Sequence, residues 1–388
     1  MSDWHEALLG DVLTLQRGYD LTEKEASPGP FPVISSGGVS YTTDVPKVDG
    51  PGVVTGRKGV LGKVHFSAGP YWPHDTTLWV KDFKGSNPRF VYYFLQTLPL
   101  ATLDAGASNP TLNRNHAHLL PVRVPPSEVQ ERIARVLGAI DDLIENNRRR
   151  VEVLEEMARA IYREWFVHFR YPGHEYIPLV DSPLGPIPDG WEVQPFSELA
   201  SFVNGFAFKP AHWGDSGRPI IKIKQLKQGV TPDTPRCDPD SIAAKYWIEP
   251  GDLLFSWSAD LGVYRWSDEP GLLNQHLFVV TPDGRSSVAY LHHALDGAMP
   301  QFWDRAQGTT MRHIKRSALS EVTTGLPPHG LIRQFTEVVD PIDHVASVLD
   351  QETRNLAGLR DLVLPKLVAG QIDVSRLDLD ELAEVASA

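Results

Sequence analysis

Hydrophobic side chains recur at alternating spacings of four and three residues along a stretch that begins near residue 127. The positions are Val129, Ile133, Val136, Ile140, Leu143, Val151, Leu154, Ala158, Ile161 and Trp165. Asn147 is the one polar residue in the series. This spacing is typical of a coiled-coil helix, which turns one apolar stripe toward a partner. We therefore predict a helix over residues 125–170, with Ser127 as its cap and Gln130 closing a capping box.

A second stretch with the same spacing lies near the end of the chain. Its positions are Leu331, Phe335, Val338, Ile342, Val345, Leu349, Thr353, Leu356, Arg360, Val363 and Leu367. Thr353 and Arg360 weaken the stripe, and Pro341 predicts either a kink or a late start of the helix. A helix of about 40 residues is about 60 Å long, and its apolar stripe must be buried. The helices over 125–170 and 326–372 are therefore expected to pair with each other.

Each predicted helix follows a region of short β-branched and aromatic runs. Examples are residues 52–55, 63–66 and 76–80 in the first region, and residues 252–257, 263–266 and 276–280 in the second. Gly, Pro, Asn and Asp separate these runs, which is typical of strands joined by tight turns. The pattern predicts a mixed α/β (α+β) fold.

The two halves of the chain repeat the same order of motifs. Pro125-Pro126 corresponds to Pro327-Pro328 at a separation of 202 residues, and Leu61-Gly62 corresponds to Leu261-Gly262 at a separation of 200. The helical parts keep one separation, whereas the strand parts drift by a few residues. This is typical of a duplicated module whose surface loops have diverged.

A segment rich in proline and glycine, residues 171–190, lies between the two copies and is expected to be an extended linker. The predicted domains are a globular domain at 1–124, a helical spacer at 125–170, this linker, a second globular domain at 191–325, a second spacer at 326–372 and an acidic tail at 373–388. Because the linker lets the second copy begin at the far end of the first helix, we expect antiparallel helices and internal pseudo-twofold symmetry.

The charge of the chain is unevenly distributed. The formal net charge is −12, which by itself argues against a nucleic-acid-binding protein. Residues 1–124, however, hold 11 basic and 11 acidic side chains, whereas residues 326–388 hold 5 and 11. The single cysteine, Cys237, forms no internal disulfide and favours a reducing compartment. Since the sequence has no apolar run of membrane-spanning length and no signal-peptide pattern at its start, we expect a cytoplasmic protein.

Several segments of the chain resemble the specificity subunit of Type I restriction-modification enzymes. They include GPGVVTGRKGVLGKVHF (50–66), LPVRVPPSEVQERIARVL (120–137), IYREWFVHF (161–169), EPGDLLFSWSADLGVYRW (249–266) and LPKLVAGQI (364–372). The resemblance implies that 1–124 and 191–325 are target-recognition domains, each reading one half of a bipartite, asymmetric DNA site. It implies helices that set the spacing of the half-sites and dock two methyltransferase subunits, with restriction subunits joining the complex. It also implies that this chain is not catalytic and that S-adenosylmethionine, ATP and Mg belong to partner subunits.

Three places in the first domain are candidate DNA contacts. Arg57 and Lys58 stand between two glycines in a turn, where a cation is placed to grip a guanine or a phosphate. The polar turn with Ser36 and Gly38, followed by Tyr41, is a second candidate. Asn113 and Arg114, just upstream of the helix, are the third. Each place is also consistent with a solvated turn or an exposed helix start.

The second domain has candidates at matching places. They are Lys222, Lys224 and Lys227 in one basic stretch, Ser256 and Trp257 at the place of Arg57, Gln275 in a turn, and Arg312, His313, Lys315 and Arg316 upstream of the second helix. Alternation in IKIKQLK predicts that Lys222 and Lys224 share one face of a strand. Basic clusters follow phosphates, and Gln binds adenine bidentately. A core tryptophan and structural hydrogen bonds are the competing interpretations.

Catalytic and metal-binding motifs do not emerge from the sequence. The pairs at His116 and His118 and at His292 and His293 have no cysteine or carboxylate at the spacing of a zinc site, so no metal is expected. The chain has no phosphate-binding loop, nucleophile elbow or dinucleotide fingerprint. Besides DNA recognition, a duplicated scaffold that holds two proteins without reading DNA stays open as the alternative function.

Overall fold

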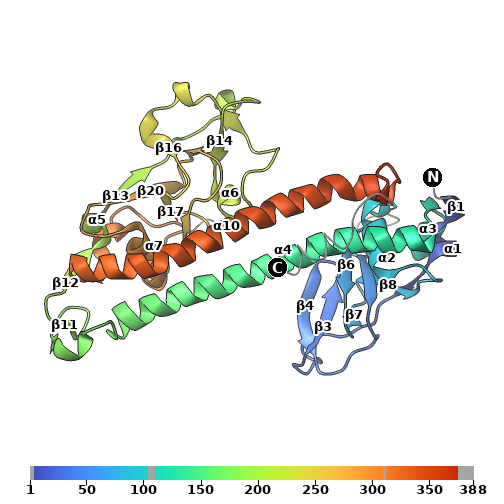
Figure 1. Cartoon of the computed structure of the whole chain (residues 1–388), viewed down its shortest axis with the longest axis horizontal. Helices are drawn as coiled ribbons and strands as arrows, with labels where there is room; N and C mark the ends of the chain where they lie inside the picture. Colours follow the sequence, from blue (N-terminus) through green and yellow to red (C-terminus); the bar gives the residue numbers. More distant parts are fainter. Residues whose placement is uncertain (1–3, 104–109, 309–311, 375–388) are drawn as a thin grey trace. The chain divides into compact units, whose positions relative to one another are not determined.

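The computed structural model describes residues 4–103, 110–308 and 312–374. The chain divides into two compact units, Met1–Glu145 together with Asn355–Ala388, and Asn146–Arg354. We call them unit 1 and unit 2. In each unit a β-rich module packs against one stretch of each of the two long helices (Figure 1). Within the described residues, no helix is long and apolar enough to span a membrane.

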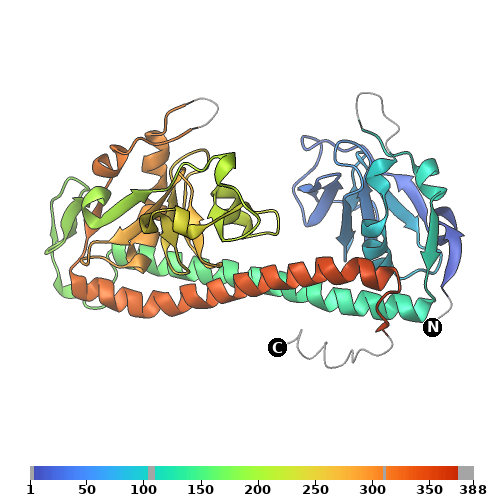
Figure 2. The same ribbon diagram turned by 90° about the horizontal axis from the view of Figure 1, so that it is seen from above.

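The long helices are α4 (Ser127–Tyr162), extended by a π-helical turn, η2 (Arg163–Val167), and α10 (His329–Val368). In unit 2, Asn147 of α4 donates a hydrogen bond to Glu352 of α10 at 3.3 Å, whereas Tyr162 lies against Phe335 with ring centroids 6.1 Å apart. Between these two contacts the residue numbers increase along α4 and decrease along α10, so the two helices run in opposite directions. Figure 2 shows that, within unit 2, the sheets lie on one side of that unit's stretch of the two helices. The predicted antiparallel pairing is confirmed.

The buried face of α10 differs from the predicted seam. Val338 and Val345 are exposed, whereas Phe335, Val339 and Ala346 are buried. The reason is that α10 packs against the β-module as well as against α4, so its buried face is wider than a two-position stripe. On α4 the predicted polar seam residue, Asn147, is buried as expected, with 1% of its surface exposed.

Two local predictions about the helix ends are wrong. Gln130 closes no capping box. Its side-chain oxygen accepts from the Asn87 backbone N–H, and its amide donates to the Pro125 carbonyl. The residue before the helix is Pro126, which has no N–H for Gln130 to accept from. Nor does α10 start late, because the helix runs without interruption through Pro341.

The β-module of unit 1 is built from short strands. The elements are β1 (His5–Leu8), α1 (Leu9–Val12), β2 (Thr14–Arg17), β3 (Phe31–Ser35), β4 (Gly38–Thr43), β5 (Gly52–Gly56), β6 (Val64–Ser67), β7 (Trp72–Pro73), β8 (Thr77–Asp82), α2 (Pro88–Thr97), η1 (Leu100–Thr102), α3 (Arg114–His118) and β9 (Pro121–Val124). One sheet has the order β2-β8-β5-β6, a second the order β4-β3-β7, and β1 pairs with β9.

The module of unit 2 repeats this plan. Its elements are η3 (His174–Tyr176), β10 (Leu179–Val180), β11 (Ile187–Pro188), β12 (Glu192–Pro195), α5 (Phe196–Leu199), β13 (Ala200–Asn204), η4 (Pro210–His212), β14 (Arg218–Ile221), α6 (Ile223–Gln228), β15 (Arg236–Cys237), η5 (Pro239–Ser241), η6 (Ala244–Tyr246), β16 (Trp247–Ile248), β17 (Leu253–Ser256), β18 (Gly262–Arg265), β19 (Gly271–Leu273), β20 (Leu277–Pro282), α7 (Val288–Gly297), α8 (Met299–Asp304), α9 (Ala318–Glu321) and β21 (Thr323–Leu326). The sheet β13-β20-β17-β18 repeats β2-β8-β5-β6, and the pair β12-β21 repeats β1-β9.

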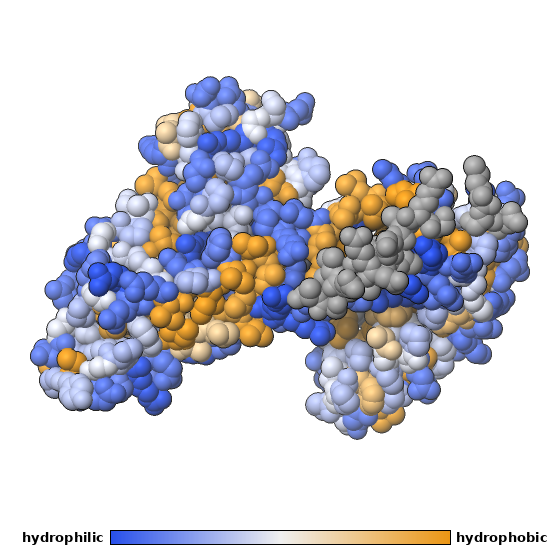
Figure 3. All heavy atoms as spheres, viewed as in Figure 1, coloured by the Kyte–Doolittle hydropathy of each residue, from blue (hydrophilic) through white to orange (hydrophobic). Residues whose placement is uncertain are grey.

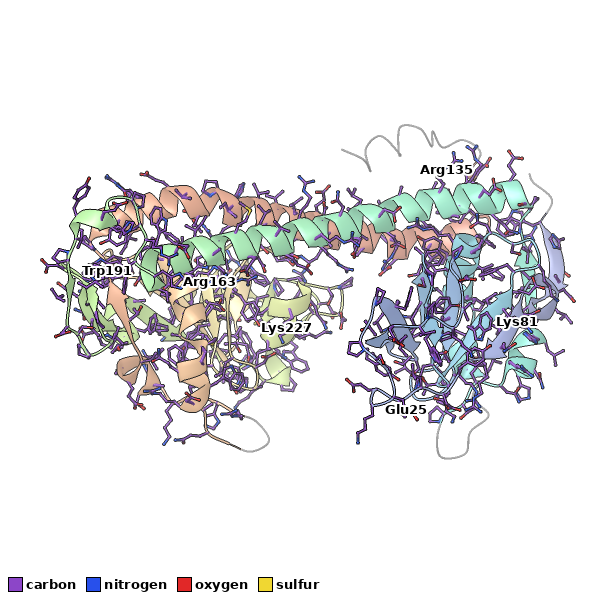
Figure 4. The ribbon with its side chains drawn as sticks, turned by 90° about the horizontal axis from the view of Figure 1, so that it is seen from below. Glu25, Lys81, Arg135, Arg163, Trp191 and Lys227 are labelled. Carbon is purple, nitrogen blue, oxygen red and sulfur yellow. The ribbon has the colours of Figure 1, made fainter. Side chains whose placement is uncertain are left out.

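Both cores continue from the module into the helices. In unit 1, Ile133 and Leu137 of α4 and Leu367 of α10 join a cluster with strand residues such as Leu15 and Val53. Figure 4 shows Arg135 on the side of α4 that faces away from the sheets. Burial of apolar surface at about 25 cal/mol per Å² thus holds each module to its helices.

The segment between the copies has more structure than an extended linker. It contains the antiparallel pair β10–β11, and Tyr171 stacks near Trp191 with ring centroids 5.9 Å apart. Trp191, labelled in Figure 4, also lies 5.9 Å from Phe166 at the end of the first helix. These aromatic contacts anchor the start of the second module. Most of the predicted acidic tail, 375–388, lies outside the described residues.

Candidate nucleic-acid interface

Backbone hydrogen bonds bring four loops of unit 1 to one edge of its main sheet. The Arg57 N–H, in the turn after β5, donates to the Thr76 carbonyl at 2.8 Å. The Leu112 N–H, upstream of α3, donates to the Arg57 carbonyl at 2.9 Å. The His74 N–H donates to the Ile34 carbonyl at 2.9 Å, which adds the turn after β3. We call residues 35–38, 56–59, 74–76 and 111–114 the first loop surface.

The same hydrogen bonds recur in unit 2 at equivalent positions. The Trp257 N–H donates to the His276 carbonyl at 3.3 Å, and the Ile314 N–H donates to the Trp257 carbonyl at 3.0 Å. The Asn274 N–H donates to the Ile221 carbonyl at 3.1 Å. We call residues 222–227, 256–259, 274–276 and 312–316 the second loop surface. The two surfaces thus share a backbone framework, whereas their side chains differ.

Asp75 organises the cations of the first loop surface. Its carboxylate lies 3.1 Å from the Arg17 guanidinium and 3.9 Å from the Lys58 ammonium. The Arg57 guanidinium is 3.4 Å from the Asp75 carbonyl oxygen. Arg17 and Lys58 keep 49% and 40% of their side-chain surface exposed, so both can exchange this carboxylate for an external partner.

Of the other predicted residues of unit 1, some are exposed and some make hydrogen bonds within the module. Arg114 is exposed, and Asn113 caps α3 by accepting from the Asn115 N–H at 2.9 Å. The Ser36 N–H donates to the Thr76 hydroxyl at 3.3 Å, and Gly38 begins β4 with a φ of +130°. The Tyr41 hydroxyl donates to the Leu21 carbonyl, so it holds the loop before β3 in place.

The prediction for Ser256 needs correction. Its side chain is fully buried and its hydroxyl donates to the Ser258 carbonyl at 3.4 Å, so no part of it faces solvent. Its neighbour Trp257 is half-buried, and its indole N–H donates to Asn204 Oδ1 at 3.0 Å. Gln275, also half-buried, accepts from the Asn274 side-chain amide at 2.7 Å.

The strand predicted for the lysines of unit 2 is wrong. Strand β14 ends at Ile221, and Ile223–Gln228 form helix α6. Lys224 and Lys227, three residues apart on this helix, form ion pairs with Asp233 and Asp260. The Lys222 ammonium lies 4.9 Å from the centre of the Trp213 ring. All three lysines keep some surface exposed, and Lys227 is labelled in Figure 4.

The basic cluster upstream of α10 is partly structural. Arg312 donates to the Trp303 carbonyl at 2.7 Å, and Arg316 donates to the Phe202 carbonyl at 2.9 Å. Lys315 is exposed, whereas His313 is half-buried with its ring 6.5 Å from that of Trp257. The arginines therefore keep the loop in shape while leaving much of their own surface accessible.

Arg17 and Asn204 were missed by the sequence argument. They are the last residues of the equivalent strands β2 and β13, and each contacts a loop-surface residue, Asp75 or Trp257. A signal was present, since a polar residue precedes a glycine at both strand ends, Arg17-Gly18 and Asn204-Gly205.

The histidine pairs fall in different surroundings. His118 accepts from the Leu15 N–H at 2.9 Å, and His116 is exposed. His292 and His293 lie on α7, and folding brings Asp343 of α10 next to both, with candidate ligand atoms within 4.8 Å of one another. The expectation that this pair has no carboxylate partner is therefore wrong in three dimensions, although it holds along the sequence.

Comparisons with known proteins agree with this architecture. Residues 1–156 match the family model described as the Type I restriction modification DNA specificity domain. The chain is 24% identical over 301 residues to the type I restriction enzyme MjaIX specificity subunit of Methanocaldococcus jannaschii. The aligned region covers 74% of this chain and 70% of that protein. It is 22% identical over 341 residues to the HindI specificity subunit of Haemophilus influenzae, with 71% and 72% covered.

A solved structure has the same fold. The S subunit of the type I restriction-modification system from M. genitalium superposes with a TM-score of 0.66 at 16% sequence identity, over 94% of this chain and 96% of that one. The duplicated modules, the paired helices, the matched specificity domain and the related sequences all point to one group of proteins. The chain resembles the specificity subunits of type I restriction-modification enzymes over most of its length, and its residues 1–156 match their DNA specificity domain.

Proposed function

We propose that this chain is the DNA-sequence specificity subunit of a type I restriction-modification complex and that each loop surface reads one half of a bipartite, asymmetric site. The observation that best supports this proposal is that the two loop surfaces share their backbone hydrogen bonds but differ in their side chains. Arg57 is replaced by Trp257, and Asp75 is replaced by Gln275. One scaffold with two sets of side chains is what an asymmetric target requires, because base edges are read by side chains and position is set by the backbone.

The side chains suit the chemistry of a base-reading surface. Guanidinium groups bind the O6 and N7 of guanine, and carboxamides bind adenine, each bidentate pair contributing about 1–3 kcal/mol of discrimination. Arg57 and Gln275 supply one group of each kind. Lys58, Arg114 and Lys315 are placed for phosphates, whose contacts carry affinity and orientation. Ser256 is buried and therefore does not contact DNA in this proposal.

The outer face of the helix pair supports the docking of other subunits. In unit 2, Val153 and Met157 of α4 and Val338, Val345 and Val348 of α10 are 43–59% exposed. Figure 3 shows hydrophobic residues gathered over these helices. Exposed apolar patches of this kind mark protein interfaces. We propose that methyltransferase subunits dock on the helices, that restriction subunits join them, and that S-adenosylmethionine, ATP and Mg are bound by those subunits while this chain stays non-catalytic.

The proposed function is tested by sequencing methylated DNA from cells that express the chain with its methyltransferase partner. A methylated motif with two different specific parts, separated by a non-specific spacer and absent without this chain, is the expected result. A stable complex that binds DNA without sequence preference would instead favour the scaffold alternative. The purified chain with DNA, Mg²⁺ and S-adenosylmethionine should show no turnover.

A further inference from the structure

Three polar side chains, one buried and two half-buried, converge in unit 2 between α7 and α10. His292 and His293 are consecutive on α7, and Asp343 lies on α10. The His293 Nε2 atom is 3.9 Å from the Asp343 Oδ1 atom, and the two imidazole rings have centroids 4.9 Å apart. One candidate ligand atom from each residue lies within 4.8 Å of the other two.

These atoms lack hydrogen-bond partners among the residues that the structure describes. His292 Nδ1, His293 Nε2 and Asp343 Oδ2 are each buried with no partner. The side chain of His293 is 5% exposed to solvent, and that of Asp343 is 10% exposed. A buried polar atom without a partner destabilises the fold, so three of them at one point indicate a ligand that binds them.

In unit 1, the equivalent contact between α2 and α4 has a hydrogen bond that satisfies its polar atoms. There, Tyr92 and Tyr93 of α2 stand at the positions of His292 and His293, and Asp141 of α4 stands at the position of Asp343. The Tyr93 hydroxyl donates to the Asp141 carboxylate at 2.6 Å. The fold itself therefore needs no histidines here, and their presence in unit 2 is a specific chemical difference between the copies.

We propose that His292, His293 and Asp343 bind a divalent transition-metal ion, with Zn²⁺ as the best fit, and that this ion fastens α7 to α10. Two imidazoles and one carboxylate are a common zinc donor set. Tetrahedral ligands with bonds of about 2.1 Å are separated by roughly 3.4 Å, so a small rotation of the side chains closes the site. A cavity of about 360 Å³ adjoins the group and leaves room for water or Glu155 as a fourth ligand.

The surrounding charges are compatible with a cation. Glu155, Asp340 and Asp343 contribute three carboxylates, and the facing guanidinium groups are Arg159 and Arg265. Arg265 is 2.8 Å from Asp340 and 3.6 Å from Asp343, so its closer partner is Asp340.

Zinc binding by the full-length chain tests this proposal. The chain is purified without a histidine tag, stripped with a chelator and titrated with Zn²⁺, and its metal content is measured by mass spectrometry. We expect one ion per chain. Asp343→Asn and His293→Tyr should each weaken binding at least 100-fold, since changes behind the ligands alone cost about 10–100-fold. Cobalt substitution should give the visible absorption of a site with nitrogen and oxygen ligands.

Two variants keep the result interpretable. His293→Tyr copies the Tyr93 arrangement of unit 1 and should keep the fold, as checked by circular dichroism. His344→Ala, the exposed neighbour of Asp343, should bind zinc like the parent chain. The proposal is overturned if the parent chain shows no saturable binding of Zn²⁺ or Co²⁺, or if His293→Tyr binds Zn²⁺ as tightly as the parent does.

Discussion

Arg57 and Trp257 occupy one backbone position in the two units, yet their side chains have different chemistry. The Arg57 N–H donates to the Thr76 carbonyl, and the Trp257 N–H donates to the carbonyl of His276, the equivalent residue in unit 2. A guanidinium group offers a fork of donors to a guanine, whereas an indole offers a flat apolar face to a sugar or a thymine methyl group. A change at one of these residues should therefore be felt in one half of the target only.

We expect Arg57→Ala to relax one half-site and Trp257→Ala to relax the other half-site. Each change should cost about 1–3 kcal/mol of discrimination at the base concerned. The measurement is the methylated motif of cells that carry each variant with its partner subunits. Lys81→Ala, at an exposed position of β8 outside both loop surfaces and both long helices, is the control that should leave both half-sites unaltered. Relaxation of both halves by a single variant would contradict the assignment of one surface to one half-site.

Asp141 is a residue on which the packing of unit 1 depends. It accepts from the Tyr93 hydroxyl at 2.6 Å and from the Arg360 guanidinium at 3.0 Å, and its side chain is 20% exposed. It therefore ties α2 and α10 to α4. Burial and the nearby Asp141 carboxylate raise the pKa of Tyr93, so this hydroxyl stays protonated and donates throughout the neutral range.

Asp141→Ala should destabilise the chain by about 2–3 kcal/mol, because it leaves the buried Tyr93 hydroxyl without its acceptor and removes one of the two carboxylates that pair with Arg360. Asp142→Ala is the matched control. Asp142 is 62% exposed and its ion pair with Arg89 lies at the surface, so its loss should cost less than about 1 kcal/mol. Urea denaturation of the full-length chain measures both values. Equal losses for the two variants would show that the contacts of Asp141 are not the stronger ones.

At the scale of elements, α10 shows a local rule overridden by packing. Pro341 lies inside the helix, where proline costs about 3 kcal/mol because it removes one backbone hydrogen bond and crowds the preceding turn. Val339 and Ala346, on either side of it, are buried within unit 2. The burial of these flanking residues outweighs the local cost and keeps the helix continuous.

Pro341→Ala should stabilise the chain by about 1–2 kcal/mol. The new N–H restores the helical hydrogen bond to Glu337, and the gain is reduced by the greater freedom of the unfolded chain. Pro341 is exposed, so the change opens no internal cavity. Thermal denaturation measures the effect, with Pro365→Ala near the end of the same helix as a comparison. A lower melting temperature for Pro341→Ala would show that the proline is favourable where it stands.

Element predictions succeeded where the pattern was long and failed where it was short. The two long helices form where they were predicted because many turns of one periodicity add up, and α4 itself ends at Tyr162 and continues as a π-helical turn to Val167. The lysine stretch at 222–227 alternates over too few residues to distinguish a strand from a helix, and α6 forms there. The wide buried face of α10, with Phe335 inside and Val338 outside, depends on a module that the helix pattern does not contain.

At the scale of the whole molecule, both long helices pass from one unit into the other. α4 crosses between Glu145 and Asn146, and α10 crosses between Arg354 and Asn355. If the helices set the separation of the half-sites, a change of length at these crossing points should alter the spacer and nothing else. The crossing points are suitable because an insertion there leaves the contacts within each unit unchanged.

Insertion of one heptad at both crossing points should lengthen the non-specific spacer by one to about three base pairs. Seven residues add about 10 Å and keep the apolar seam in phase, and DNA rises by about 3.4 Å per base pair. Both half-sites should stay unaltered in the methylated motif. A heptad inserted into α4 alone should break the pairing and abolish methylation. An unchanged spacer after the double insertion would refute the proposed ruler.

Periodicity and repetition, which the sequence contains in full, determined the two helices, their pairing and the duplication of the module, because these depend on many residues that act in the same sense. The sequence also marked Arg57, Trp257 and the basic cluster near Arg312 as candidates. Only the tertiary structure decided which side chains are accessible, as at the buried Ser256, and which distant groups meet, as at Asp75 and Arg17 or His293 and Asp343. Such contacts depend on how strands and helices pack in three dimensions, and the spacing of residues along the chain does not determine that packing.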